Sequence, residues 1–159
     1  MKKTLVILGL FSVTLLYFSD VLTGKLLLME RDLSTFFYPF RFLWVETVLQ
    51  GHFPYWNPYL KCGVPLAATI QPGVLYPLSL LYFLLPSDLA FNWTIIIHFF
   101  LAAAFTFILL RELGASVQGA MAGAMAFLLG GYLISVHNVL NTLLAVCWYP
   151  MAIFCGCRL

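Results

Sequence analysis

Long apolar runs alternate with one polar stretch along the chain. The apolar runs cover about residues 4–22, 89–110, 117–137 and 142–157, and Asp20 is the one Asp, Glu, Lys or Arg inside them. A membrane-spanning helix needs about 20 mostly apolar residues. The pattern therefore predicts an all-α integral membrane protein, a single membrane domain over residues 1–159 with about four transmembrane helices.

A shorter apolar segment, about residues 74–86, precedes the second predicted span and contains Pro77. It is too short to cross a bilayer and suits an interfacial or re-entrant helix. In the third predicted span, Gly119 and Gly123 form a small-x-x-x-small pattern. That pattern favours packing against a neighbouring span of the same chain over a dimer interface.

The polar stretch, about residues 23–73, is predicted to form a long first outer loop. Pro39 fits the first turn of a helix and Gly51 its end, and aromatic residues between them recur at helical spacing. Arg41 and Glu46 are polar members of this segment. A helix of about 12 residues with this mixture is expected to lie in the membrane surface, with Arg41 extending to the interface.

Residues 52–66 contain three prolines among aromatic residues. Proline is excluded from helix interiors and strand centres. Tryptophan and tyrosine favour the lipid headgroup zone. We expect a stiff, irregular loop that lies against the bilayer surface and forms one wall of a pocket at the outer face.

Composition supports a membrane location and excludes other classes. Hydrophobic residues make up 63% of the chain and charged residues 9%, and the mean hydropathy is +0.99. A soluble domain is nearer half apolar and a quarter charged. The net charge of +2 is not clustered, so no nucleic-acid partner is predicted. The four cysteines have no C-x-x-C spacing, and neither a metal nor another cofactor is indicated.

The positive-inside rule sets the expected orientation. Lys2, Lys3, Arg111 and Arg158 would face one side in short tails and loops, where the rule is strongest. Both termini are therefore predicted in the cytoplasm and the long loop outside. No small-x-small cleavage site follows the first apolar run, which is interpreted as an uncleaved span.

Asp32 is the main candidate for chemistry. It follows the first span, beside Arg31 and before the aromatic segment, where a carboxylate can act as a general base or bind a ligand cation. The alternative is a solvated charge at a helix N-terminus. Glu46 is a weaker candidate, with surface charge as its alternative. His137 is expected at the outer face, with helix-end capping as its alternative.

A long pattern of residues in this region resembles the first outer loop of the YfhO-like bacterial membrane proteins. Arg111-Glu112-Leu113-Gly114 after the second predicted span also fits that family. The matching positions of the loop are Asp32, Tyr38-Pro39-Phe40, Glu46, Gly51, Pro54-x-Trp56-Asn57-Pro58-Tyr59, Gly63-x-Pro65-Leu66, Gln71-x-Gly73 and Tyr76-Pro77.

The resemblance implies a function. The family is similar in plan to GT-C membrane glycosyltransferases, which take sugar from a polyprenyl-phosphate carrier at the outer membrane face. Its members are linked to glycosylation of cell-surface polymers such as lipoteichoic acid. Carried over, an acidic residue of the first outer loop points to Asp32 as catalytic. The substrate-binding candidates are Arg41, Glu46, Trp56, Asn57 and His137, with Arg41 as a cation for the leaving lipid phosphate.

Two alternatives remain at this point. YfhO-like proteins run several-fold longer, with many more spans, so the chain is expected to correspond to an N-terminal portion or a truncated gene. It would then be an incomplete enzyme or an inactive fragment. The other alternative is a non-catalytic membrane scaffold or a subunit that translocates lipid or sugar. The predicted location is the bacterial cytoplasmic membrane, with membrane lipids, a polyprenyl-phosphate sugar donor and a cell-surface polymer acceptor as partners.

Overall fold

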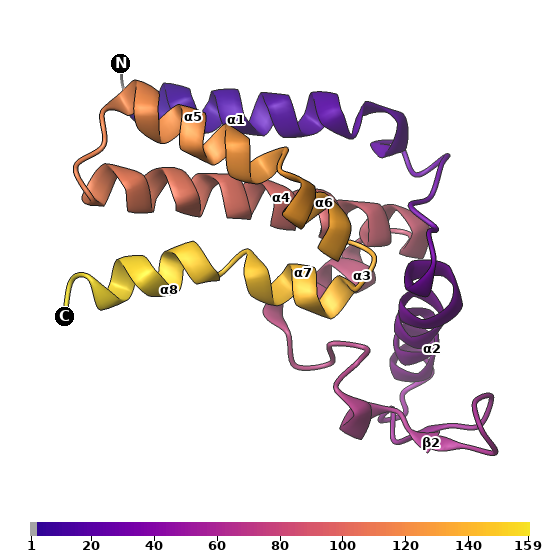
Figure 1. The fold of residues 1–159 in the computed structure, drawn as a ribbon. Coiled ribbons are helices and arrows are strands. Elements are labelled where there is room, and N and C mark those ends of the chain that lie inside the picture. Colours follow the sequence, from indigo (N-terminus) through magenta and orange to yellow (C-terminus); the bar gives the residue numbers. More distant parts are fainter. Residues whose placement is uncertain (1–2) are drawn as a thin grey trace. The chain divides into compact units, whose positions relative to one another are not determined.

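The computed structural model describes residues 3–159, and the fold is mostly helical (Figure 1). Lys2, which enters the orientation argument, lies outside the described residues. The elements in chain order are α1 (Lys3–Tyr17), a 3-10 turn (Ser19–Val21), a π-helical turn (Leu33–Phe37), α2 (Tyr38–Leu49), β1 (Trp56–Asn57), β2 (Val64–Pro65), 3-10 turns at Ala67–Thr69 and Pro77–Leu80, α3 (Leu81–Leu84), α4 (Ser87–Glu112), α5 (Val117–Leu128), α6 (Gly131–Val136), α7 (Leu140–Val146) and α8 (Tyr149–Gly156).

The chain divides into two compact units. The bundle unit comprises Met1–Leu22 and Ile95–Leu159, and the loop unit comprises Thr23–Thr94. Helix α4 begins in the loop unit and continues into the bundle unit. The polar stretch thus folds as a body of its own together with the first turns of α4.

Two helical segments are long and apolar enough to cross a membrane. They are Ser87–Glu112, with 26 residues, and Val117–Val136, with 20 residues. The first extends the helix expected at about 89–110 by two residues at each end. The second contains α5 and α6, which meet at Gly130.

The first and last apolar runs form shorter helices than expected. Helix α1 ends at Tyr17, and a 3-10 turn follows at Ser19–Val21. Serine and aspartate compete for backbone hydrogen bonds and favour turns, which explains this early end. The last run is divided after Val146, and α8 carries Pro150 in its first turn. Proline has no N–H to donate to the carbonyl four residues back.

Aromatic contacts and one glycine hold the bundle unit together. Phe11 of α1 packs edge-on against Phe100 of α4, with ring centroids 5.1 Å apart. A Cβ added at Gly123 would lie 2.4 Å from Leu110 Cδ1, so α5 approaches α4 closely at this glycine. Gly123 of the small-residue motif therefore packs within the chain, whereas a Cβ at Gly119 would meet only Ser116 Oγ at the start of the same helix. Figure 1 shows α1 beside α4 and α5.

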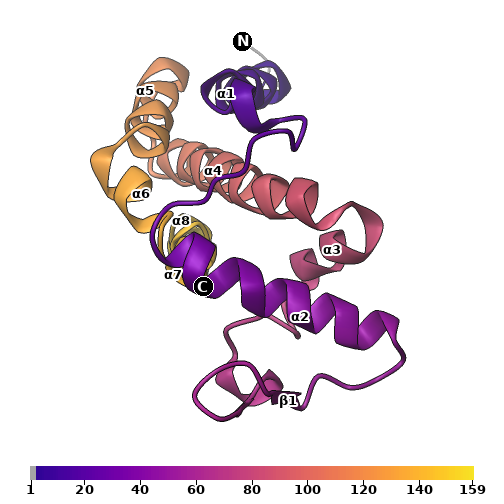
Figure 2. The same cartoon turned by 90° about the vertical axis from the view of Figure 1, so that its right-hand side faces the viewer.

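In the loop unit, α2 packs its apolar face against α3 (Figure 2). Trp44 is buried and lies edge-on to Phe83, with ring centroids 5.2 Å apart. Asn92 of α4 donates to Leu26 O at 2.7 Å and accepts from Leu28 N at 3.1 Å, which fixes the chain that leads into the π-helical turn. The helix expected from Pro39 to Gly51 is present as α2, and the short segment before α4 forms only the 3-10 turn and α3.

The proline-containing loop is more regular than expected. Trp56 pairs with Pro65 and Asn57 with Val64 in an antiparallel two-stranded ladder. Leu66 N also donates to Tyr55 O at 2.9 Å. A ladder of two residues leaves both strands at an edge, where proline is tolerated. The expectation of a wholly irregular loop is corrected accordingly.

Candidate functional site

Asp32 lies on a locally unusual backbone in the loop unit. Arg31 has a φ of 46°, a left-handed conformation that non-glycine residues rarely adopt. The π-helical turn Leu33–Phe37 follows Asp32, and Tyr38 N–H donates to Leu33 O, five residues back. Both π-helical turns and left-handed non-glycine residues concentrate at functional sites.

The carboxylate of Asp32 is exposed and makes no capping hydrogen bond within the described residues. Its backbone is nevertheless held on both sides. The hydroxyl groups of Ser34 and Thr35 donate to Arg31 O at 2.8 Å and 3.2 Å, and Leu33 is fully buried. Asp32 is thus an accessible carboxylate on a constrained backbone, as a base or a ligand-binding group requires.

Arg41 is buried, with 1% of its surface exposed. Its Nη1 donates to Pro72 O at 3.1 Å and to Ser79 Oγ at 3.3 Å, and its guanidinium lies 5.4 Å from the centre of the Tyr82 ring. Burial lowers the pKa of Arg41, and the nearby phenols of Tyr82 and Tyr76 act in the opposite direction. The expectation of an arginine extended to the membrane interface is wrong, because the side chain turns inward to hold residues 72–82 against α2.

Gly73 makes room for this guanidinium. It adopts a φ of 67°, and a Cβ at this position would lie 3.0 Å from Arg41 Nη1 and 3.1 Å from Ser79 Oγ. No other residue type combines that conformation with that close approach at low cost. The Gln71-x-Gly73 part of the sequence pattern therefore serves the Arg41 contact.

The remaining loop candidates differ in exposure. Glu46 is exposed on α2, and Trp56 is 55% exposed. Asn57 is 5% exposed, and its Oδ1 accepts from Tyr59 N at 2.9 Å, so its amide shapes the hairpin turn. Tyr55 and Tyr59, close to Trp56 in the sequence, are also exposed, at 72% and 85%.

A contact between Tyr38 and Asp88 was missed from the sequence. Tyr38 Oη donates to Asp88 Oδ1, and the Tyr38 ring lies edge-on to Phe91 with centroids 5.3 Å apart. Burial, followed by the hydrogen bond and the charge of Asp88, raises the pKa of Tyr38 to about 12. The sequence indicated only a span that begins at about residue 89. A partner 50 positions away leaves no local signal.

His137 lies in the bundle unit, directly after α6. Its Nδ1 is hydrogen-bonded to Ile134 O, three residues earlier. This contact fits the helix-end alternative stated for His137.

Within residues 3–159, no group of three or more histidine, cysteine, aspartate or glutamate side chains is placed to hold a metal ion. No protein-family model matches the chain, and neither the curated proteins nor the solved structures contain a match.

Proposed function

We propose that the chain belongs to a membrane glycosyltransferase-like protein, which uses a polyprenyl-phosphate-linked sugar to glycosylate a cell-surface polymer. The observation that carries the proposal is the exposed Asp32 carboxylate between a left-handed Arg31 and a π-helical turn. The resemblance to the YfhO-like loop, in which Asp32 holds the acidic position, supplies the reaction class.

In the proposed reaction, Asp32 accepts the proton of an acceptor hydroxyl. The hydroxyl oxygen then attacks the anomeric carbon of the donor sugar from the face opposite the carrier. The bond from that carbon to the phosphate oxygen breaks, and its electron pair leaves with the lipid phosphate. Configuration is inverted, and proton transfer to a positioned carboxylate lowers the barrier.

Arg41 has a different part in this proposal from the one expected for it. Its guanidinium is buried against Pro72 and Ser79 and so supports the fold of the loop unit. Glu46 and Trp56 remain exposed groups for contact with substrate.

The proposal includes a four-span arrangement in a bacterial cytoplasmic membrane, with both termini in the cytoplasm and the loop unit outside. Two segments have the length and hydropathy that crossing needs. Arg158 after α8 pairs with Glu112 at the end of α4, at 3.0 Å between Nε and Oε1. Such a pair is expected if both helices end at one membrane face.

Asp32→Asn tests the function in a purified protein that contains this chain. Transfer of sugar from a polyprenyl-phosphate donor is expected to fall by about 100-fold or more, the usual contribution of a general base. Asp20→Asn is the matched control, because it removes another exposed carboxylate. Circular dichroism confirms that both variants fold.

Normal transfer by the Asp32→Asn protein would remove Asp32 from the mechanism. Binding of the sugar lipid by the unchanged protein without any bond formation would instead favour the non-catalytic scaffold or translocation subunit.

A further inference from the structure

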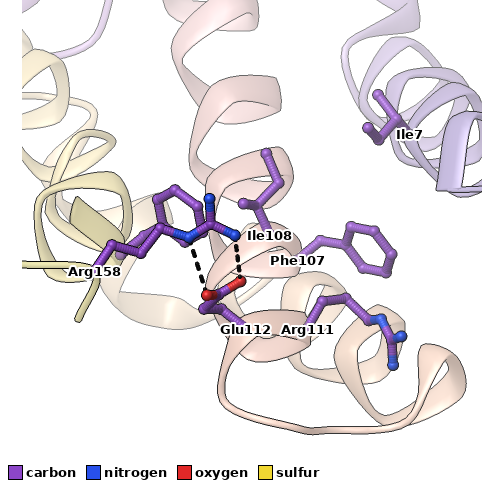
Figure 3. Close-up of a pocket in the computed structure, with 7 residues that line it drawn as sticks. Ile7, Phe107, Ile108, Arg111, Glu112 and Arg158 are labelled. Carbon is purple, nitrogen blue, oxygen red and sulfur yellow. Dashed lines mark hydrogen bonds and ion pairs between the residues drawn. The ribbon is translucent and has the colours of Figure 1, made fainter.

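A small cavity lies in the bundle unit, where α4 and α8 end. Its volume is about 150 Å³. Ile7 of α1, with Phe107 and Ile108 of α4, gives it apolar walls, and Arg111, Glu112 and Arg158 also line it (Figure 3). The cavity therefore combines an apolar interior with charged groups, and none of these residues takes part in the proposed transfer reaction.

Two of the charged groups neutralise each other. Arg158 Nε donates to Glu112 Oε1 at 3.0 Å and Arg158 Nη2 to Glu112 Oε2 at 3.1 Å, a bidentate pair. The Arg158 guanidinium also lies 4.9 Å from the centre of the Phe154 ring. Two arginines and one glutamate leave one net positive charge among the lining residues, and that charge belongs to Arg111.

The guanidinium of Arg111 is held by one hydrogen bond, and another of its nitrogen atoms has no partner among the described residues. Its Nη1 donates to Ala115 O, which fixes the guanidinium at the end of α4. Its Nε is buried and has no hydrogen-bond partner within the part of the chain that the structure describes. Figure 3 shows Arg111 extending away from the Arg158–Glu112 pair. The uncompensated positive charge of Arg111 beside an apolar cavity favours an anionic ligand.

We propose that this cavity binds a phosphate group, with Arg111 as its principal ligand. A guanidinium binds phosphate oxygens through directed, charge-assisted hydrogen bonds. Basic pockets between membrane helices on the cytoplasmic side bind the headgroups of anionic lipids. The apolar walls formed by Ile7 and Phe107 suit the chain of such a lipid. This proposal does not depend on the transferase activity.

The test measures binding to the purified full chain in detergent micelles. Phosphatidylglycerol and phosphatidylcholine are compared as lipid probes, and inorganic phosphate is the soluble probe. Arg111→Gln is expected to weaken binding of the phosphate-bearing probe about tenfold, as for loss of one charged hydrogen bond. Glu112→Gln is expected to strengthen it, because it removes a carboxylate that repels the anion from the lining of the cavity. Lys25→Gln, an exposed charge in the loop unit, should change nothing.

The Glu112→Gln arm keeps the test informative, because a gain in affinity cannot come from loss of folding. Preference for phosphatidylglycerol without binding of inorganic phosphate identifies a lipid headgroup, and binding of inorganic phosphate identifies a soluble source. The proposal is overturned if the unchanged protein binds phosphatidylglycerol no better than phosphatidylcholine and does not bind inorganic phosphate. It is also overturned if folded Arg111→Gln protein keeps full affinity.

Discussion

At the scale of single residues, Arg41 organises the interior of the loop unit. Its guanidinium is almost without exposed surface and makes two hydrogen bonds to residues 72–82. Removal of such a group leaves Pro72 O and Ser79 Oγ buried without that donor, and stranded buried polar groups are costly. Loss of Arg41 is therefore expected to destabilise residues 72–82, which accept its hydrogen bonds.

Arg41→Met should lower the free energy of unfolding by about 1–3 kcal/mol, since the polar groups that accepted from Arg41 lose their partner. Equilibrium unfolding in mixed micelles measures this change. Arg31→Met is the control, because that side chain is exposed. Equal stability of the two variants would contradict the structural role of Arg41.

Tyr38 should make the stability of the loop unit depend on pH in the alkaline range. Its pKa is raised from 10.0 to about 12 in the folded chain. Above pH 10 the unfolded chain therefore loses this proton more readily than the folded chain does. By linkage, the contribution of Tyr38 is fully present below pH 10 and is lost as pH rises toward 12.

Tyr38→Phe should accordingly reduce the fall in stability between pH 10 and pH 12 without changing its slope below pH 9. Thermal unfolding at a series of pH values measures the slopes. Tyr59→Phe, at an 85% exposed ring, is the matched control. An unchanged alkaline slope in Tyr38→Phe would show that the contact with Asp88 does not hold in solution.

At the scale of elements, the hairpin depends on one glycine. Gly63 has a φ of 109°, and a Cβ there would lie 2.3 Å from Cζ2 of Trp56. Gly63→Ala must therefore displace the indole ring as well as strain the backbone. Gly51 also has a positive φ of 81° but has open space around it. Comparing alanine at the two positions therefore distinguishes the effect of steric crowding from that of backbone strain.

Gly63→Ala is expected to destabilise the loop unit by about 1–3 kcal/mol more than Gly51→Ala does, the usual cost of overpacking. Limited proteolysis within residues 53–66 measures local opening. Equal protease sensitivity of the two variants would mean that Trp56 does not pack over Gly63.

The elements that could be predicted from the sequence are those determined by their own residues. Helix α4 follows from its uninterrupted apolar run, and α2 from Pro39 and Gly51 at its ends. The early end of α1 and the division before Pro150 were not predicted from hydropathy. Hydropathy does not reveal that serine and aspartate side chains compete for backbone hydrogen bonds, or that proline lacks a backbone N–H. The hairpin was missed because its prolines argued against strands, although a two-residue ladder tolerates them.

At the scale of the whole molecule, the topology proposal makes a direct prediction. Reporter fusions after Gly51 and after Gly114 should lie on opposite sides of the membrane. The physical reason is that Ser87–Glu112 is the one segment between them with both the length and the hydropathy to cross. The reporters are one enzyme that is active only outside the cytoplasm and one that is active only inside it. Finding both positions on the same side would contradict the four-span arrangement.

The candidate site was predictable only in part. Asp32 stands out in the sequence as a carboxylate between a span and an aromatic helix, but the left-handed Arg31 and the π-helical turn have no sequence signature. The contacts of Arg41 with Pro72 and Ser79 join positions more than 30 residues apart. Only the folded chain shows that this arginine faces inward.

The π-helical turn makes the segment before α2 sensitive to its length. Its hydrogen bond spans five residues, one more than in an α-helix, and Asp32 stands directly before it. Loss of Ser34 or Thr35 would allow a regular helix and rotate Asp32 by about 100° around the helix axis, one residue's step in a 3.6-residue turn. Insertions and deletions at residues 33–37 should therefore be selected against more strongly than substitutions at the same positions.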